Sequence, residues 1–516
     1  MLSDVVTSAE RRAAYERNGW WDGETLSRRV RAHAAAQPDA VAVVDRDGAR
    51  RHTYGELDRD VRTTAGWLAG RGVATGDVVS VQLPNWYEFV VAATAAQSLG
   101  AVINPLLPVY RRTELLHVFA VAQPKVIFTP STYRGHDHVT ATKEAIAESG
   151  VAVEHVVVDD GLPAAGAAGL DSQDAAAVSE LIFTSGTEAA PKAIMHTEQT
   201  ANFSVRVAYR DLVMSGADVV WMPSPIGHST GFNYGVRFAL YHGLRLVLQD
   251  RWDASVAHGL IASEQASYTL ASTTFLQDLV GEAERRGGTL TSMQRFGCGG
   301  APVPAELVRR GRARGIGVLR LYGSTEVLVA TWNRPGSPEE KKEATDGLAM
   351  SDVEVAVRED GEIFTRGPNT CVGFYRDAER TAATFEDGWV RSGDLATMDA
   401  DGYLTVVGRK KEIIIRGGMN ITPREIEELL LGFPEVDRAA VVGLPDERLG
   451  ERVCACVVLR PGCALSLEDV VGRLRAIGLA TYKLPQRLAV LDALPMTASG
   501  KVQKFEIVKR LTWSPG

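Results

Sequence analysis

Long apolar segments are missing from this sequence. No apolar run reaches about 18 residues, the length that a helix needs to cross a bilayer. The segment from Met1 to Trp21 alternates acidic and basic side chains around no apolar centre, which argues against a signal peptide there. We therefore expect a protein without a membrane span.

Extended basic runs are missing as well. The 56 lysines and arginines are outnumbered by 64 aspartates and glutamates, and the formal net charge is -8 at pH 7. This balance makes nucleic acid and anionic membranes poor partners. If the protein binds an anionic molecule such as ATP, local cationic side chains and magnesium have to meet its charge.

Cysteine is scarce. The five cysteines are Cys298, Cys371, Cys454, Cys456 and Cys463. An odd number without the spacing of a metal site indicates reduced thiols, and we expect a cytoplasmic protein. Cys454 and Cys456 alternate along an apparent strand, where packing in a core is the favoured interpretation.

The sequence does contain a long alternation of strand-like and helix-like stretches. A chain of 516 residues normally forms more than one domain. In the first two thirds, strands are predicted at 78–83, 101–104, 219–222, 244–248, 268–271 and 318–322, and helices at 85–99, 273–286 and 304–314. Alternating units of this length indicate parallel sheets covered by helices.

The pattern changes after about Asp346. Asp-Gly turns at 360–361, 387–388 and 401–402 separate short strands, which predicts a small β-rich subdomain. Further along, we predict a charged strand at 409–416 that leads into a Gly417-Gly418 turn.

A helix follows this turn at 423–431, with Thr422 as its cap and proline at its first position. The domain boundary is placed near residues 408–411. The predicted fold class is α/β: a large N-terminal domain (1–408) of βα-layered sheets with the β-rich subdomain, then a small mobile α+β domain (409–516).

The strongest local motif follows an apolar strand at 181–183. It consists of Thr184, Ser185, Gly186, Thr187, Glu188, Ala189, Ala190, Pro191 and Lys192. Small hydroxyl residues and glycine leave backbone N–H groups free to wrap phosphate oxygens, and Lys192 adds positive charge. The spacing differs from that of a P-loop. Alone, such a loop is as often structural as functional.

Three further motifs carry groups that suit a nucleotide, and the first two of them end apolar strands. Tyr322 to Glu326 (Tyr-Gly-Ser-Thr-Glu) offers a ring that can stack on a base and a carboxylate that can hold magnesium. Gly299 to Pro302 would let a flat base approach, and Ser392-Gly393-Asp394 offers a carboxylate for ribose hydroxyls. Each motif alone fits an ordinary turn, but together and in this order they do not.

These motifs resemble those of the superfamily of acyl-CoA synthetases, peptide-synthetase adenylation domains and luciferases, over about Leu26 to Lys509. The resemblance implies a phosphate loop made by Thr184, Ser185, Gly186, Thr187 and Lys192. The adenine side would be made by Gly300, Ala301, Pro302, Tyr322, Gly323, Ser324 and Thr325. The ribose contacts would be Asp394 and Arg409. The resemblance also implies a pivot at Lys411 within 408–411, and a catalytic lysine, Lys501, at the end of 495–501.

The remaining roles also come from the resemblance. Glu326 and Thr187 would hold Mg²⁺, and Gly417 and Gly418 would flank a tunnel for the pantetheine arm of coenzyme A. His228, in the loop 225–228, would orient the acid or gate the tunnel, although a structural histidine is the simpler alternative. The acid pocket would comprise His228, Phe232, Asn233, Tyr234, Cys298 and Gly299.

The implied reaction uses a small-molecule carboxylic acid, ATP, Mg²⁺ and CoA. The acid attacks ATP to give an acyl-adenylate, and the small domain then turns about Lys411 so that the thiol attacks. The sequence looks closest to the branch of CoA ligases for medium-chain and alicyclic acids. We therefore expect an apolar medium-chain, alicyclic or polycyclic acid.

One departure from the superfamily pattern concerns the phosphate loop, where Glu188 and Ala189 replace a threonine and a glycine. Glu188 either points to solvent, which we favour, or helps to hold the metal. His196, His33 and His242 match no motif and are predicted to be structural.

Several alternatives stay open. One is a freestanding adenylating enzyme that loads the thiol of a carrier protein, and another is a nucleotide-binding regulator without catalysis. No residue points to an oxygenase of the luciferase type. The protein is expected to be a homodimer or a monomer.

Overall fold

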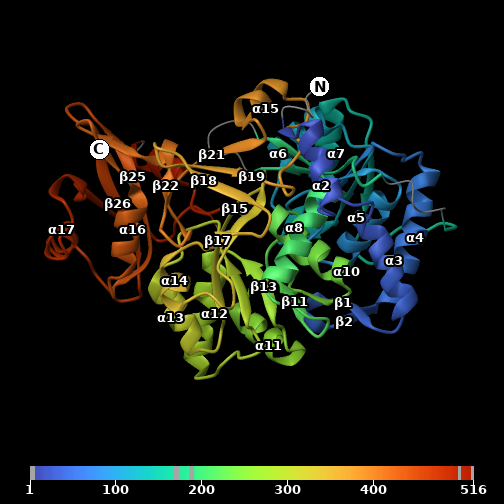
Figure 1. Ribbon diagram of the computed structural model, residues 1–516, viewed down its shortest axis with the longest axis horizontal. Helices are drawn as coiled ribbons and strands as arrows, with labels where there is room; N and C mark the ends of the chain where they lie inside the picture. The colour runs from blue at the N-terminus through green and yellow to red at the C-terminus, as the bar shows by residue number, and fades with distance from the viewer. Residues whose placement is uncertain (1–5, 168–173, 185–190, 498–500, 513–516) are drawn as a thin grey trace.

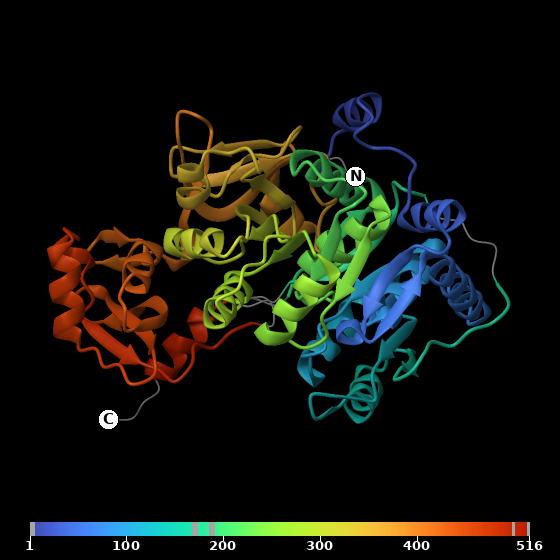
Figure 2. The same ribbon diagram turned by 90° about the horizontal axis from the view of Figure 1, so that it is seen from below.

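The computed structural model describes residues 6–167, 174–184, 191–497 and 501–512. Among these residues, the strands form four larger sheets and one small hairpin. The helices cover both faces of the first two sheets, and the C-terminal part of the chain forms a separate unit at one side (Figure 1). Figure 2 shows this unit beside the rest of the molecule.

The largest sheet has nine strands and a parallel centre. Its order is β17 (Leu348–Ala349), β16 (Leu328–Trp332), β15 (Val318–Ser324), β14 (Arg295–Cys298), β13 (Tyr268–Ala271), β11 (Val219–Met222), β12 (Arg245–Leu248), β1 (Val41–Asp45) and β2 (Arg50–Thr53). Strands β15 to β1 run parallel, and antiparallel strands close both edges. The carboxyl ends of β11, β13, β14 and β15 therefore meet along one edge.

The second sheet has six strands. Its order is β10 (Ala193–Thr197), β9 (Val178–Phe183), β4 (Val102–Pro105), β3 (Val78–Val81), β5 (Val126–Thr129) and β8 (Glu154–Val157). Only β10 is antiparallel to its neighbour here, and the β9–β10 pair encloses the predicted phosphate loop. A two-stranded hairpin, β6 (Thr132–Tyr133) and β7 (His136–Asp137), follows β5.

Helices pack between these two sheets and on their outer faces. One apolar core joins strands of both sheets with α3 (Leu26–Ala36), α4 (Tyr54–Gly70), α5 (Tyr87–Ser98), α8 (Glu198–Asp211) and α10 (Phe238–His242). Every residue of α5 is buried, because this helix lies inside the core. The outer faces carry α11 (Ala254–Glu264), α12 (Thr273–Arg286) and α13 (Ala305–Ala313) on one sheet, and α6 (Arg112–Ala122) and α7 (His138–Ser149) on the other.

The third sheet is antiparallel and agrees with the predicted β-rich subdomain. It contains β18 (Glu354–Val357), β19 (Glu362–Arg366), β21 (Trp389–Met398), β20 (Phe385–Glu386) and β22 (Leu404–Arg409). Asp387 and Gly388 join β20 to β21 with φ of 47° and 75°, which is the backbone of the tight hairpin turn that Asp-Gly favours. Shorter helices in this part of the chain and near its start are α2 (Ala9–Arg17), α14 (Glu339–Ala344) and α15 (Ala378–Thr384).

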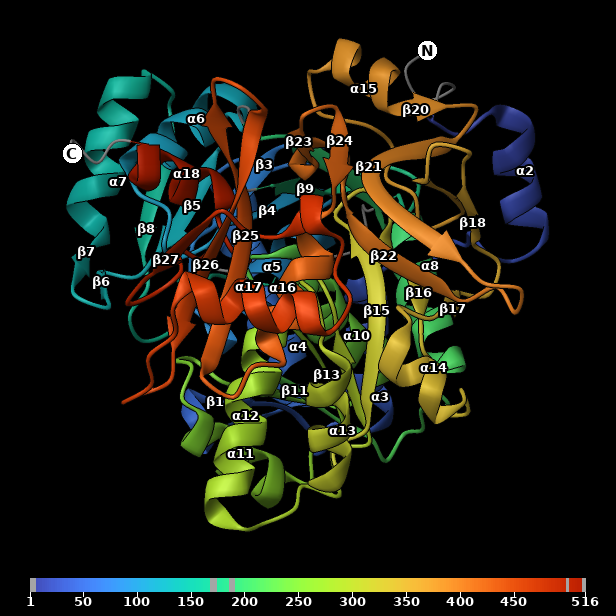
Figure 3. The ribbon, with the colours of Figure 1, turned by 90° about the vertical axis from the view of Figure 1, so that its left-hand side faces the viewer.

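The C-terminal unit has a sheet with helices on both faces (Figure 3). Its strands are β24 (Met419–Ile421), β23 (Ile414–Arg416), β26 (Gly450–Leu459), β25 (Val436–Asp446) and β27 (Arg487–Val490). Helices α16 (Pro423–Leu431) and α17 (Leu467–Ala476) pack on one face and α18 (Lys504–Thr512) on the other. Cys454 and Cys456 lie buried in the second of these cores, as predicted.

The strand predicted at 409–416 is wrong in one respect. The chain leaves the third sheet at Arg409, makes a 3-10 turn (η3, Lys410–Glu412), and enters the C-terminal sheet at Ile414. The break is stabilised by charge, because Lys410 Nζ contacts Asp360 Oδ2 at 2.8 Å and Glu362 Oε2 at 3.1 Å. The hydrophobic pattern of a charged segment does not show whether the segment continues as a strand or breaks into a turn.

Two smaller expectations can also be compared. Gly417 and Gly418 turn between β23 and β24 with φ of 57° and 81°. Thr422 occupies the N-cap of α16 and Pro423 its first position, but among the described residues the threonine side chain makes no capping hydrogen bond.

In the part of the chain that the structure describes, no helix combines the length and apolarity of a membrane span.

Candidate active site

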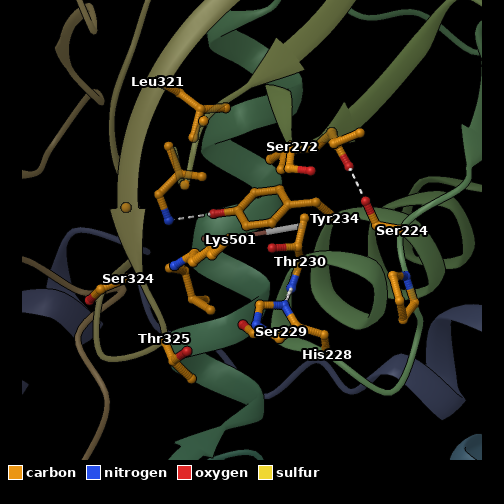
Figure 4. Close-up of a pocket in the computed structure, with 18 residues that line it drawn as sticks. Ser224, His228, Ser229, Thr230, Tyr234, Ser272, Leu321, Ser324, Thr325 and Lys501 are labelled. Carbon is orange, nitrogen blue, oxygen red and sulfur yellow. Dashed lines mark hydrogen bonds between the residues drawn. The ribbon is translucent and has the colours of Figure 1, made fainter. Parts of the chain in front are cut away.

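A first cavity, of about 80 Å³, lies where the carboxyl ends of the central parallel strands meet. In open α/β sheets, ligands bind at this edge. The lining residues come from the ends of four strands, the loop after β11 and the C-terminal unit (Figure 4): Ser224, Pro225, His228, Ser229, Thr230, Tyr234, Leu270, Ala271, Ser272, Gly299, Gly300, Leu321, Gly323, Ser324, Thr325, Leu328, Val329 and Lys501.

A second cavity, of about 190 Å³, lies beside the first, between β15, the third sheet and the C-terminal unit. Most of the predicted nucleotide residues line it together: Gly300, Ala301, Pro302, Tyr322, Gly323, Asp394, Arg409 and Lys501. Ser324 and Thr325 line the first cavity instead. Segments that are far apart in the sequence, from Gly300 to Lys501, therefore converge on two adjoining spaces.

Asp394 organises the second cavity. One of its carboxylate oxygens, Oδ2, accepts a 2.9 Å hydrogen bond from the Tyr322 hydroxyl, and Oδ1 pairs with Arg409 Nε at 2.9 Å. This carboxylate raises the pKa of Arg409, and burial raises the pKa of Tyr322 well above its usual value. Because a carboxylate offers about four lone-pair positions, Asp394 can still accept from ribose hydroxyls.

Two glycines at this edge allow neighbouring backbone segments to approach closely. A Cβ at Gly323 would lie 2.0 Å from the carbonyl oxygen of Leu328, and one at Gly299 would lie 2.6 Å from that of Leu321. These two glycines are therefore required by neighbouring strands, whatever ligand approaches them. The interpretation of Gly299 as an opening for a flat base is therefore replaced by a packing requirement.

Lys501 is the one described residue of the C-terminal unit that borders both cavities. Its backbone is held by Thr497, whose N–H donates to the Lys501 carbonyl at 2.7 Å and whose Oγ1 accepts from the Lys501 N–H at 3.0 Å. Burial lowers the pKa of Lys501, the charge of Arg409 lowers it further, and Asp394 and Glu326 oppose this effect. An anionic ligand beside Lys501 would favour its protonated form.

His228 begins the short helix α9 (Ser229–Gly231) and faces the first cavity (Figure 4). Its Nδ1 accepts a 3.3 Å hydrogen bond from the Thr230 N–H. Burial, together with the charge of Lys501, lowers the pKa of His228 to about 4, so the ring is neutral at pH 7. A neutral ring can orient a carboxylate by a hydrogen bond but adds no positive charge.

The phosphate loop lies largely outside the described residues. Ser185, Gly186, Thr187 and Glu188 belong to that part, so the roles predicted for them stay predictions. The two ends of the loop are described: Thr184 N donates to the Lys192 carbonyl at 3.0 Å. Lys192 Nζ then lies 3.5 Å from Glu326 Oε1, so the structure brings the phosphate-loop lysine to the predicted metal ligand.

The predicted acid pocket is corrected in part. Tyr234 and Gly299 line the first cavity, whereas Phe232, Asn233 and Cys298 are not among its described lining residues. Phe232 packs in the core against Phe89, with ring centroids 6.1 Å apart. Consecutive residues of a helix point in different directions, and Phe232 to Arg237 form a single π-helical turn (η2).

Asn233 and Cys298 face other surroundings. Asn233 Nδ2 donates to Glu180 Oε2 at 3.0 Å, and its Oδ1 accepts from Arg237 Nε at 3.1 Å, inside a fully buried ion cluster. The Cys298 side chain lies in the apolar core between the nine-stranded sheet and helices α11, α12 and α13. Side chains alternate between the two faces along a strand, so Cys298 points to this outer face.

Several apolar lining residues belong to no motif of the sequence, namely Leu270, Ala271, Leu321, Leu328 and Val329. Leu270, Ala271 and Leu321 lie at or near the carboxyl ends of parallel strands, and this position is their one recognisable signal. Leu328 and Val329 begin β16, which is antiparallel to β15, so the turn between these two strands brings them to the cavity.

A third cavity, of about 260 Å³, adjoins the first at Pro225. Pro108, Tyr133 and Trp252 line it from the larger part of the molecule, and Arg438 and Met496 from the C-terminal unit. Gly417 and Gly418 line none of the three cavities among the described residues, and Lys411 lies in η3 between the two sheets.

The donor set near Glu326 can be tested for magnesium. Within the described ranges, no cluster of three or more His, Cys, Asp or Glu residues could hold a metal ion. Magnesium beside a triphosphate needs less, since it is usually bound through one or two carboxylates and the phosphates themselves. Glu326 beside Lys192 fits that arrangement.

The chain matches known proteins along nearly its whole length. A family model described as AMP-binding enzyme matches residues 30–375, and one described as AMP-binding enzyme C-terminal domain matches residues 425–501. A medium-chain fatty-acid–CoA ligase from Escherichia coli (strain K12) is 38% identical, over 99% of this chain and 95% of that protein.

Two further comparisons agree with this match. A salicylyl-CoA synthase / salicylate adenylyltransferase from a Streptomyces species is 33% identical, over 95% of this chain and 94% of its own length. The ATP-bound crystal structure of MatB from Rhodopseudomonas palustris superimposes with a TM-score of 0.84 at 26% identity, covering 94% of this chain and 99% of the other.

Proposed function

Because this chain belongs to the AMP-binding enzyme family, we propose that it activates a carboxylic acid with ATP and transfers the acyl group to CoA. The products would be pyrophosphate, AMP and an acyl-CoA. Lys501 carries this proposal, because it borders both the cavity with an apolar lining and the cavity that gathers Asp394, Arg409 and Tyr322. The acid and the nucleotide would react at this junction, beside the positive charge of Lys501.

In the first half-reaction, a carboxylate oxygen forms a bond to the α-phosphorus of ATP and the bond to pyrophosphate breaks. A carboxylic acid is already ionised at neutral pH, so no general base is needed. Lys501 would stabilise the charge that grows on the phosphate oxygens, which is the type of contact that lowers a barrier most. His228, being neutral, would orient the acid.

Magnesium would add charge neutralisation at the phosphates when it binds with ATP. Glu326 would hold it, with Lys192 beside the same phosphates. Thr187 remains the second expected ligand and lies outside the described residues.

In the second half-reaction, the thiol sulfur of CoA forms a bond to the acyl carbon, AMP leaves, and the thiol proton is released. The third cavity offers an approach, since it adjoins the first at Pro225 and is partly covered by Arg438 and Met496. We propose that residues 409–516 turn about Lys411 as one domain against residues 1–408. This turn would withdraw Lys501 and bring Gly417 and Gly418 to the thiol path.

The lining of the first cavity supports an apolar acid. Leu270, Leu321, Leu328 and Val329 face it with the ring of Tyr234, and among its described lining residues there is no carboxylate to pair with the ammonium of an amino acid. The substrate class is therefore a medium-chain, alicyclic, polycyclic or aromatic acid.

An acid-dependent ATP–pyrophosphate exchange screen tests this function. Medium-chain, alicyclic, polycyclic and aromatic acids should support exchange, and the best acid should then give thioester with free CoA as sole acceptor. Exchange with amino acids, or with acetate alone, would overturn the substrate class. Exchange without thioester would instead favour the thiol of a carrier protein. Cytoplasmic location and a monomeric or homodimeric state stay predictions.

A further inference from the structure

The turn that carries Thr325 and Glu326 is held by side chains from elsewhere in the fold. We call residues 325–329, which link β15 to β16 and include the first two residues of β16, the Glu326 turn. His196 Nε2 lies 2.7 Å from the Thr325 carbonyl oxygen, and Asn369 Nδ2 lies 2.5 Å from the carbonyl of Val327 and 3.0 Å from that of Val329. These contacts supply side-chain donors to three backbone carbonyls of the turn.

Two more bonds complete this support. The Tyr234 hydroxyl accepts from the Val329 N–H at 2.8 Å, and Cys371 N donates to the Glu326 carbonyl at 2.8 Å. Tyr234 and Thr325 lie on different sides of the first cavity in Figure 4. His196, Asn369 and Tyr234 are at most 2% exposed. The Glu326 turn is therefore held at both ends and in the middle by buried groups.

The backbone of the turn does not favour this shape by itself. Leu328 has φ of 54°, a left-handed conformation that a bulky residue rarely adopts. Such conformations persist only where the surroundings determine them, and they cluster at functional sites. Here the turn orients Thr325 into the first cavity and Glu326 toward Lys192, at 3.5 Å.

The chemistry of His196 is unambiguous. A carbonyl oxygen can only accept, so Nε2 must carry a proton. The other nitrogen, Nδ1, lies 3.1 Å from Thr200 Oγ1, whose hydroxyl also donates to the Thr197 carbonyl at 3.1 Å. Burial lowers the pKa of His196, which favours the neutral ring. His196 also lies on β10, in the same strand that begins after Lys192, so it joins the phosphate loop to the Glu326 turn.

We propose that His196 and Asn369 are positioning residues that fix the Glu326 turn, so that Glu326 meets the magnesium–triphosphate without rearranging. This inference rests on the proposed function, since it assumes that Glu326 binds magnesium with ATP. It replaces the purely structural role expected for His196. Partners that orient a metal ligand typically affect metal affinity or activity by about tenfold to a hundredfold when they are removed.

A matched pair of variants isolates the hydrogen bond. The glutamine amide in His196→Gln reaches about as far as Nε2, whereas the amide in His196→Asn is one methylene shorter and falls short of the Thr325 carbonyl. His242→Asn is the control, because His242 Nε2 also contacts a backbone carbonyl, that of Val205 at 3.2 Å, away from the cavities. Melting temperatures first establish that each variant is folded.

The decisive measurement is calorimetric binding of ATP without acid, over a range of magnesium concentrations. His196→Asn should lose about tenfold or more of the magnesium-dependent affinity, His196→Gln should recover most of it, and His242→Asn should match the unchanged protein. Thioester formation from supplied acyl-AMP, which involves no triphosphate, should be unaffected in all three. Asn369→Ala should reproduce the loss, and it decides the matter if His196→Asn does not fold.

The coupling to Glu326 gives a second readout. If His196 acts through this carboxylate, adding His196→Asn to Glu326→Gln should change magnesium-dependent binding little beyond Glu326→Gln alone. Unchanged magnesium dependence in both His196→Asn and Asn369→Ala, or equal slowing of both half-reactions, would overturn the inference. Absence of exchange with every acid in the unchanged protein would instead defeat the proposed function, since ATP binding is measured without acid.

Discussion

At the scale of single residues, the site is defined by a few charges held close together in a partly buried space. Lys501, Arg409 and Lys192 supply positive charge, and Asp394 and Glu326 oppose it. With the carboxylates already in place, an incoming triphosphate would meet cations whose positions are fixed, two of them partly buried and Arg409 exposed. Such preorganised groups act more strongly than the same charges in water.

Lys501→Ala should abolish most of the adenylation activity and spare the second half-reaction. Loss of one transition-state donor costs about 3 kcal/mol, which is a hundredfold or more in rate. Pyrophosphate exchange should fall by that factor, while thioester formation from supplied acyl-AMP should continue. An equal fall in both half-reactions would assign Lys501 a structural role.

Lys501 should also set an alkaline limit on the first half-reaction. Its pKa is lowered by burial, so in the free enzyme the charge is lost as pH rises through a value below the usual 10.5. The rate of adenylation at low ATP should therefore fall on the alkaline side. Lys501→Arg should move this limit to higher pH, because a guanidinium stays protonated. An unmoved limit would identify another titrating group.

The sequence predicted the residues that form consecutive motifs and missed those that do not. Tyr322, Asp394 and Arg409 belong to such motifs, and the structure brings them together. The resemblance assigned the consecutive residues Phe232, Asn233 and Tyr234 to the acid pocket, although successive side chains of a helix point in different directions. His196 gave no signal at all, since its role depends on the spatial neighbour Thr325.

At the scale of elements, η3 is the connection between two sheets that do not pair with each other. Strand β22 ends with Arg409 opposite Asp394, and β23 begins at Ile414 opposite Ile421 of the next sheet. The turn between them, Lys410–Glu412, is short and carries no buried side chain. A connection of this kind can absorb a large dihedral change at small cost.

Lys411→Pro should trap the orientation in which Lys501 borders the cavities. Proline fixes φ near about -65° and removes an N–H donor, which suits a 3-10 turn and prevents another conformation there. The variant should still exchange pyrophosphate but should fail to form thioester, whereas Lys411→Ala should change little. Near-normal thioester turnover by the proline variant would place the pivot elsewhere.

Regular elements were predictable where their periodicity was simple. Strands β11 and β13 and helix α12 have the predicted bounds, Val219–Met222, Tyr268–Ala271 and Thr273–Arg286. The break at η3 could not be predicted, because a run of charged residues does not show whether a strand continues. The π-helical turn at Phe232–Arg237 was also beyond reach, since buried ion contacts rather than local propensity stabilise it.

At the scale of the whole molecule, the C-terminal unit contacts the rest at more than one place. Gln277 Nε2 donates to the carbonyl of Asp437 at 3.1 Å, and Arg438 Nη2 lies 3.5 Å from Asp278 Oδ1. These contacts join α12 to the start of β25, on the side of the third cavity. They stabilise the orientation that keeps Lys501 in place.

Arg438→Ala should shift the balance between the two orientations by a modest amount. Partly exposed ion pairs contribute about 1 kcal/mol or less, which corresponds to about fivefold at most. Pyrophosphate exchange should fall within that range, and thioester formation from acyl-AMP should not fall. Arg473→Ala is the matched control, because its partner Glu435, at 2.8 Å, lies within the same unit. Equal effects of the two variants would exclude a role in orientation.

A side chain that borders two spaces also separates them. While Lys501 occupies the junction, it shields the mixed anhydride that forms there from the open side of the cavities. If residues 409–516 turn about Lys411 as proposed, the withdrawal of Lys501 would expose that anhydride to water as well as to the thiol. The rate of this domain movement relative to hydrolysis would then set the fraction of adenylate that is lost to water.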